Sequence, residues 1–73
     1  MAIIMKLSAC NRIGGTIREV RTGRTTAHVR IDIGNRVVVA ASITNETVDE
    51  LGLKAGDKAV AAIKASDVMV AVE

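Results

Sequence analysis

Aromatic residues, proline and paired cysteines are all missing from this chain of 73 residues. Without Phe, Tyr or Trp, the core has to be built from Val, Ile, Leu, Ala and Met. The lack of aromatic rings also argues against nucleic acid, because small β-barrels that bind single strands generally stack the bases on such rings. Cys10 is the only thiol, so an internal disulfide is excluded, and no Cys/His cluster has the spacing of a metal site.

The small size predicts one domain, spanning residues 1–73, whose core supplies only a few kcal/mol of net stability. Since the sequence offers neither a disulfide nor a metal site to stabilise the fold, we expect oligomerisation to supply the remaining stability. The hydrophobic start, Met1 to Met5, is too short for a signal peptide or a membrane span, and we interpret it as a strand. The chain is therefore expected to be cytoplasmic, with no membrane partner, and to cover part of its apolar surface by association.

The net charge is only +2, and the charges are unevenly distributed. Arginines are spread from Arg18 to Arg36, whereas acids collect between Glu46 and Asp57. This pattern is typical of solvated strand faces. Binding of nucleic acid is the alternative interpretation, which the missing aromatic platform disfavours, so no nucleic-acid partner is expected.

Alternation of apolar and polar residues predicts a half-buried strand from Thr26 to Ile33. One side of this strand carries Ala27, Val29, Ile31 and Ile33, and the other carries His28, Arg30 and Asp32. Gly34 and Asn35 both tolerate the positive φ of a two-residue hairpin turn. This turn leads into a second strand from Arg36 to Ile43, which is almost continuously apolar.

Glycines, and a change in the spacing of the apolar residues, indicate further secondary-structure elements. Gly14–Gly15 predicts a sharp bend or bulge before a strand from Thr16 to Arg21, and Thr22–Gly23 predicts a turn. After Thr44 the spacing of Val48, Leu51 and Leu53 favours a short helix, which Gly52 or Gly56 would end.

The last two strands are expected at Lys58 to Ile63 and Val68 to Val72. In total the pattern predicts five or six short strands, with one short helix after the fourth. This arrangement is typical of an all-β fold, a small OB-like Greek-key barrel. A sandwich of two sheets is the alternative.

Three polar segments interrupt the apolar pattern and are candidates for one anion site. They are Ser8-Ala9-Cys10-Asn11, Thr44 with Thr47, and Lys64-Ala65-Ser66. Together they offer hydroxyls, backbone N–H groups and one lysine, the groups that a small oxyanion requires. The simpler interpretations are that Thr44 is an N-cap, contributing about 1 kcal/mol, and that Lys64 points to water.

Nucleophilic catalysis has no support in these residues. No acid or second base accompanies the candidate hydroxyls, and the single His28 lies on the polar side of its strand. Cys10 is better explained as a small packed residue than as a reactive thiol. We therefore expect a binding protein and not an enzyme.

The same segments resemble the molbindins, the single-domain form of the molybdate-binding Mop or TOBE module, over essentially the whole chain. The resemblance is carried by five stretches, at residues 5–11, 27–34, 42–44, 48–57 and 63–69. It implies an OB-like barrel that exchanges strands in a dimer and assembles as a trimer of dimers, a homohexamer. It also implies that molybdate or tungstate binds between subunits, with no organic cofactor, for storage, buffering or homeostasis in the cytoplasm.

The resemblance further implies roles for individual residues. The segment of Ser8, Ala9, Cys10 and Asn11 corresponds to the stretch that reaches the anion from one subunit. A neighbouring subunit would line the same pocket with Thr44, Thr47, Lys64, Ala65 and Ser66.

Cys10 departs from the molbindin pattern, which usually reads Ser-Ala-Arg-Asn at this segment. The change removes a fixed positive charge and a bidentate donor. A lost charge-assisted hydrogen bond costs about 1.5 to 3 kcal/mol, so binding roughly tenfold to hundredfold weaker is expected where that arginine contacts the ligand. Arg12, two positions along the strand, shares a face with Cys10 and is a candidate substitute. An oligomerisation or regulatory module with weakened or altered anion binding is therefore the alternative function.

Overall fold

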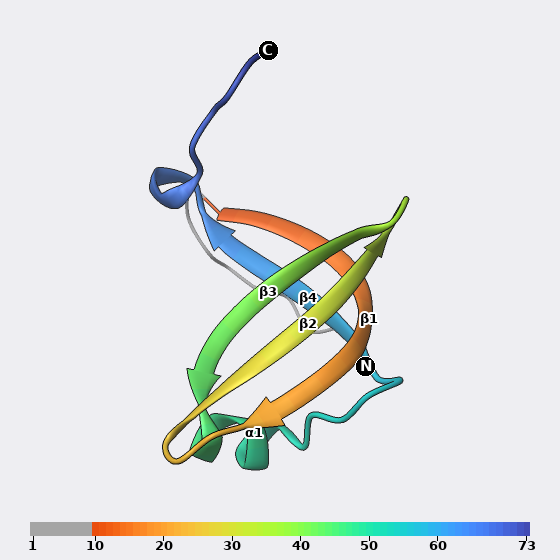
Figure 1. Cartoon of the computed structure of the whole chain (residues 1–73), viewed down its shortest axis with the longest axis vertical. Helices are drawn as coiled ribbons and strands as arrows, with labels where there is room; N and C mark the ends of the chain where they lie inside the picture. The colour runs from red at the N-terminus through yellow and green to blue at the C-terminus, as the bar shows by residue number, and fades with distance from the viewer. Residues whose placement is uncertain (1–9) are drawn as a thin grey trace.

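The computed structural model describes residues 10–73, which form a curled antiparallel sheet with one short helix (Figure 1). The elements are β1 (Cys10–Thr22), β2 (Thr26–Gly34), β3 (Val37–Thr44), α1 (Asn45–Leu51), β4 (Lys58–Lys64) and the 3-10 turn η1 (Ala65–Asp67). The strand expected at Met1 to Met5 lies outside the described residues, as do Ser8 and Ala9.

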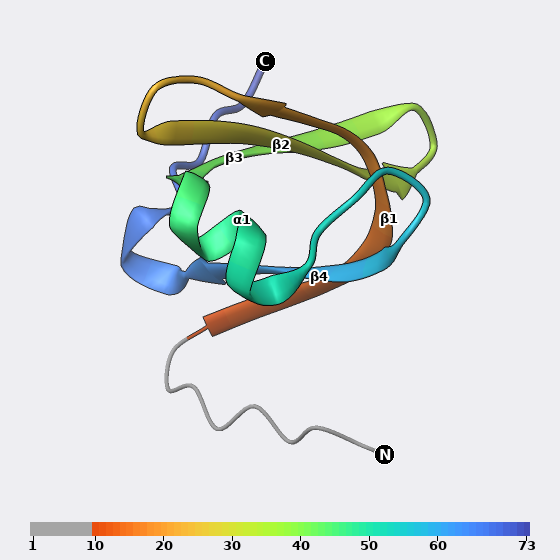
Figure 2. The ribbon, with the colours of Figure 1, turned by 90° about the horizontal axis from the view of Figure 1, so that it is seen from below.

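The strand order in the sheet is β3-β2-β1-β4, with every neighbouring pair antiparallel. Three strands joined by hairpins, with a fourth returning beside the first, make a Greek-key arrangement. The sheet curls until β4 and the first part of β1 lie opposite β2 and β3, while α1 lies across one open end (Figure 2). The predicted OB-like barrel is confirmed, and the alternative of two stacked sheets is wrong because all four described strands belong to one sheet.

The central strand β1 joins the two sides of the curl. Its first half pairs with β4, its second half pairs with β2, and Thr16 pairs with both neighbours. At Gly15 a Cβ atom would lie 2.5 Å from the carbonyl oxygen of Asp32 and 2.9 Å from a methyl carbon of Ile31. Only glycine allows the backbones to approach this closely where the strand bends.

The predicted bend at Gly14–Gly15 therefore lies inside one continuous strand and not between two strands. The bulge comes slightly later, between Ile17 and Glu19, where the register with β2 shifts.

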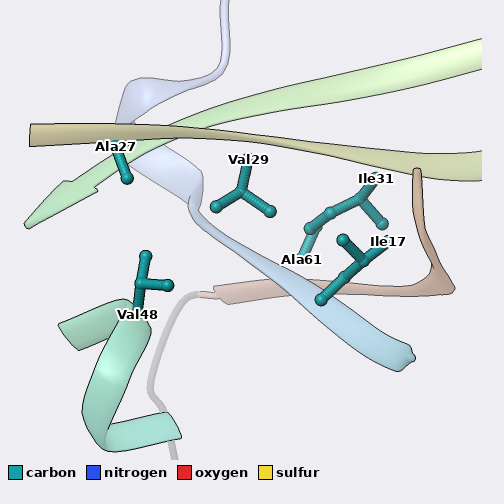
Figure 3. Close-up of a cluster of buried hydrophobic side chains, with 6 residues drawn as sticks. All are labelled: Ile17, Ala27, Val29, Ile31, Val48 and Ala61. Carbon is teal, nitrogen blue, oxygen red and sulfur yellow. The ribbon is translucent and has the colours of Figure 1, made fainter. Parts of the chain in front are cut away.

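The core lies inside the curl and is small, as the composition predicts. Its buried members come from every described strand except β3, and one comes from α1: Ile17, Ala27, Val29, Ile31, Val48 and Ala61 (Figure 3). The predicted inward set of β2 is confirmed for Ala27, Val29 and Ile31, while Ile33 is half-buried.

The hairpin between β2 and β3 lies one residue later than expected. Asn35 and Arg36 form the two-residue loop, with φ of 52° and 63°. Positive φ at both central positions is the type I′ condition, which matches the twist of the flanking strands. Arg36 occupies a position that favours glycine, so part of the stability of this hairpin is lost to backbone strain.

Helix α1 ends at Gly52, the first of the two glycines predicted to end it, and this residue has left-handed backbone angles, φ 63° and ψ 38°. The N–H of Leu53 donates to Val48 at 3.1 Å and closes the last turn.

The strand expected at Val68 to Val72 does not form within the chain. After η1 the backbone leaves the sheet and joins no described ladder (Figure 1). Val68, Met69, Val70 and Val72 are 49%, 93%, 89% and 91% exposed, respectively. Alternating valines make a strand only when a sheet edge is available to pair with, and residues 10–73 offer this segment no such pairing.

Candidate functional site

The first and last candidate segments, far apart in the sequence, lie side by side in the sheet. Cys10 pairs with Lys64 and Asn11 pairs with Ile63 in the ladder between β1 and β4. The Asn11 side-chain amide also donates to the Ile63 carbonyl at 3.4 Å. The resemblance assigned these two segments to different subunits, whereas Cys10 and Lys64 are neighbours within one chain. Their contribution to a common anion site stays a prediction.

This corner of the barrel faces outward. Ile13 and Ala61 form a register pair directed at the core, so the neighbouring positions Cys10, Arg12 and Lys64 alternate to the outer face. Lys64 is exposed, whereas the Cys10 thiol is half-buried and lies 3.4 Å from the Asn11 carbonyl oxygen. Cys10 and Arg12 do share a face, because the register is regular from Cys10 to Thr16.

Ala65 and Ser66 continue the corner into η1. The Ala65 carbonyl accepts a hydrogen bond from Val68 at 3.3 Å, which holds the turn closed beside Lys64. Among residues 10–73, the Ser66 hydroxyl and the Lys64 ammonium have no hydrogen-bond or ion-pair partner. Lys64 at the end of β4 and Ser66 in the following turn are thus both exposed, two residues apart in the chain.

Thr44 and Thr47 lie elsewhere, at the junction of β3 and α1. Figure 1 shows this junction and η1 at separate places on the molecule. The Thr44 hydroxyl accepts the Thr47 N–H at 3.0 Å, and the two hydroxyl oxygens are 2.7 Å apart. Thr44 is therefore the N-cap of α1, the simpler of the two interpretations, and within one chain the pair does not join the other candidates.

Asn45 ties this junction to the turn between β1 and β2. Its backbone N–H donates to Thr25 and its side-chain amide donates to Gly23, both at 2.8 Å. The other side-chain atom, Oδ1, is buried and lacks a partner among the described residues. Asn45 fixes the start of the helix and was not among the sequence candidates, although an Asn next to an N-cap is a signal for such anchoring.

The chemistry available at the Cys10–Lys64 corner is that of anion recognition. No group of three or more His, Cys, Asp or Glu side chains within residues 10–73 could hold a metal cation. His28 is exposed on β2, as predicted, and lies opposite Arg21 and Ser42 in the sheet. No helix in this described portion is long and apolar enough to cross a membrane.

A group of cations on the outer face of β1 and β2 was not identified as a site from the sequence. Arg18 and Glu19 occupy the bulge opposite Arg30, and these three side chains line one surface hollow. The sequence does carry a signal for this bulge. Arg18 and Glu19 are two consecutive polar residues between the apolar residues Ile17 and Val20, and such a pair breaks the alternation of a regular strand.

Comparison with known proteins agrees with the fold. Residues 7–70 match the TOBE domain. A probable molybdenum-pterin-binding protein of Haemophilus influenzae is 42% identical over 69 residues, covering 94% of this chain and 100% of that protein.

Two solved structures are also similar. A molybdate-binding protein from Sporomusa ovata superimposes with a TM-score of 0.86 at 32% identity, covering 93% of this chain and 100% of the other. The cytoplasmic molybdate-binding protein ModG gives a TM-score of 0.83 at 40% identity, covering 89% of this chain and 46% of that one. The chain therefore belongs to the TOBE-domain family, among the molbindins.

Proposed function

We propose that this protein binds molybdate, or its analogue tungstate, as an intact oxyanion at contacts between copies of itself, and so stores or buffers it in the cytoplasm. The observation that carries the proposal is the corner where Cys10 pairs with Lys64 and Ser66 follows in the next turn; among residues 10–73 the Lys64 ammonium and the Ser66 hydroxyl have no partner. Its relatives named for binding molybdate or a molybdenum pterin support the choice of ligand.

The corner of one chain holds only part of the groups that a buried dianion requires. A charged ligand withdrawn from water needs several hydrogen bonds to replace its hydration. Here the ammonium and hydroxyl lie on an open face, and the Asn11 amide already donates to Ile63. A second copy placing Thr44, Thr47 or the Ser8–Ala9 segment against this face would complete the set.

Association has its own support in the exposed C-terminal segment. Val68, Val70 and Val72 alternate along extended backbone, and β3 and β4 each have only one neighbour in the described sheet. Pairing of this segment with the edge of another copy would bury apolar surface and satisfy backbone groups on both sides. We infer a strand-exchanged homo-oligomer, with a homohexamer as the expected state.

Recognition in such a site requires neither catalysis nor a cofactor. Hydroxyls, backbone N–H groups and Lys64 would hold the anion, and discrimination against sulfate would depend on cavity size, because the two anions share shape and charge. Ligand bound between subunits would also stabilise the oligomer by mass action.

Calorimetric titration with molybdate in excess sulfate tests the proposal. Lys64→Gln should weaken binding about tenfold to hundredfold, because it removes one charge-assisted hydrogen bond. Lys54→Gln is the matched control, since this exposed lysine lies in the loop after α1 and should leave the affinity unchanged. Failure of the native chain to bind either molybdate or tungstate would overturn the proposal.

Cys10 favours a second candidate function, an oligomerisation or regulatory module whose anion binding is weakened or altered. The half-buried thiol stands beside Lys64 where the molbindin pattern has arginine. Cys10→Arg should then create saturable binding in a chain that otherwise shows none. If both forms bind with similar affinity, the second candidate is wrong, and Arg12 on the same face becomes the residue to test.

A further inference from the structure

The bulge in β1 gathers arginines on the outer face of the sheet. Two residues of the bulged strand, Arg18 and Glu19, stand opposite the single residue Arg30 of β2. Without the extra residue, the alternation along β1 would direct one of them toward the core. The bulge therefore leaves Ile17 and Val20 inside while both charged side chains reach the surface.

A second row of polar side chains continues this face. Arg21 of β1 lies opposite His28 of β2, and Glu19, Arg21, His28 and Arg30 line a second hollow. We call the set Arg18, Arg21 and Arg30 the cationic strip, and His28 lies beside it. All three arginines are exposed residues, and Glu19 is the acid among them.

The strip is open to a partner. Its neighbours on β3 are small, with Ala40 opposite Arg30 and Ser42 opposite His28, so they do not cover the guanidinium groups. Glu19 is neutralised by Arg21, whose Nη2 lies 2.9 Å from its carboxylate oxygen. Arg18 and Arg30 make no ion pair with any residue in the range 10–73, which leaves two arginines available for external carboxylates.

We propose that the cationic strip docks an acidic segment of a partner protein. Arginine is well suited to this contact because its planar fork binds carboxylates with two parallel hydrogen bonds. The strip lies on the side of the curl away from β4, so a docked partner would leave the Cys10–Lys64 corner accessible (Figure 2). The inference concerns a different face from the oxyanion site and does not depend on it.

Nucleic acid fits this face less well. The chain has no aromatic side chain on which bases could stack, and its net charge is only +2. Glu19 and Arg21 form an ion pair within the strip, so Arg18 and Arg30 remain for a ligand, fewer positive charges than a continuous phosphate backbone would contact.

The test is binding of the full chain to a labelled peptide of alternating Glu and Ser, with single-stranded oligothymidylate as the comparison. The double variant R18Q/R30Q should bind the peptide about threefold to tenfold more weakly, the range expected for exposed charge pairs. The matched control K54Q/K58Q removes two lysines outside the strip and should bind like the native chain. Molybdate titration of R18Q/R30Q should be unaffected, which separates this proposal from the oxyanion site.

Several results would overturn the inference. Equal weakening in both double variants would mean that the peptide responds to net charge alone. Tighter binding of oligothymidylate than of the peptide would favour nucleic acid. A change in mass of R18Q/R30Q by light scattering would instead place the strip between copies of this chain, and absence of any peptide binding by the native chain would also refute the proposal.

Discussion

Two adjacent glycines in β1, Gly14 and Gly15, should respond differently to the same substitution by alanine. Gly15 faces the point where β2 crosses, and an added Cβ would lie 2.5 Å from the Asp32 carbonyl oxygen. Gly14 is the preceding residue and does not have positive φ; apart from its chain neighbours, no heavy atom of residues 10–73 lies within 4 Å of its Cβ position. Gly15→Ala is therefore a steric perturbation, whereas Gly14→Ala is a matched control with the same chemistry.

The magnitude follows from the contact distances. Ordinary contact begins at 3.4 Å, so the Cβ at 2.5 Å requires the backbones to separate by about 0.9 Å. A hydrogen bond stretched that far is lost, at about 0.5 to 1.5 kcal/mol, and overpacking costs about 1 to 3 kcal/mol. Alanine also lowers the conformational entropy of the unfolded chain, which stabilises the fold by about 0.4 to 1 kcal/mol. We therefore expect Gly15→Ala to lower the free energy of unfolding by about 2 kcal/mol in total.

Thermal unfolding monitored by far-ultraviolet circular dichroism measures this difference. A loss of that size in a domain of 73 residues should lower Tm by roughly 8 to 16 °C. Gly14→Ala should leave Tm unchanged or raise it slightly. All three proteins must be compared at one concentration, because association shifts apparent stability. Equal Tm values for the two variants would refute the reasoning that the bend requires glycine at position 15.

Three further predictions concern the hairpin, the helix cap and the C-terminal segment. Arg36→Gly should raise the free energy of unfolding by about 0.5 to 1 kcal/mol in urea denaturation, because φ is 63° there, while Arg36→Ala should retain the strain. Thr44→Ala should lower the free energy of unfolding by about 1 kcal/mol, because it removes the hydrogen bond from the Thr47 N–H, whereas Thr44→Ser should keep that bond. Equal effects of the two substitutions would contradict the N-cap role of Thr44. Val70→Asp should reduce the oligomer mass in light scattering without unfolding the barrel, since this side chain is 89% exposed within one chain; an unchanged mass would count against the C-terminal segment as an association surface.

The local sequence was sufficient for most elements of the sheet. Alternation around Val29 and Ile31 correctly predicted which face of β2 is buried, because side chains alternate on any strand regardless of its neighbours. The helix was equally predictable, since Thr44 and Gly52 satisfy the backbone groups at its two ends. The segments containing Cys10 and Lys64 were selected as parts of one site, which stays a prediction, and the structure makes them neighbours within one chain. The family resemblance agrees with the comparisons.

Features that depend on pairing between distant segments required the tertiary structure. The bulge that exposes both Arg18 and Glu19 exists only relative to the register of β2, so the sequence alone suggested scattered solvated charges. The separation of the β3–α1 junction from η1 likewise follows from how far the sheet curls, which local propensity does not determine (Figure 1). Val68 to Val72 has the pattern of a strand, but a strand forms only where another edge supplies its hydrogen bonds, and this segment pairs with neither edge strand of the described sheet. Sequence thus determined which residues favour strand, helix and burial, while the tertiary structure decided which of them meet.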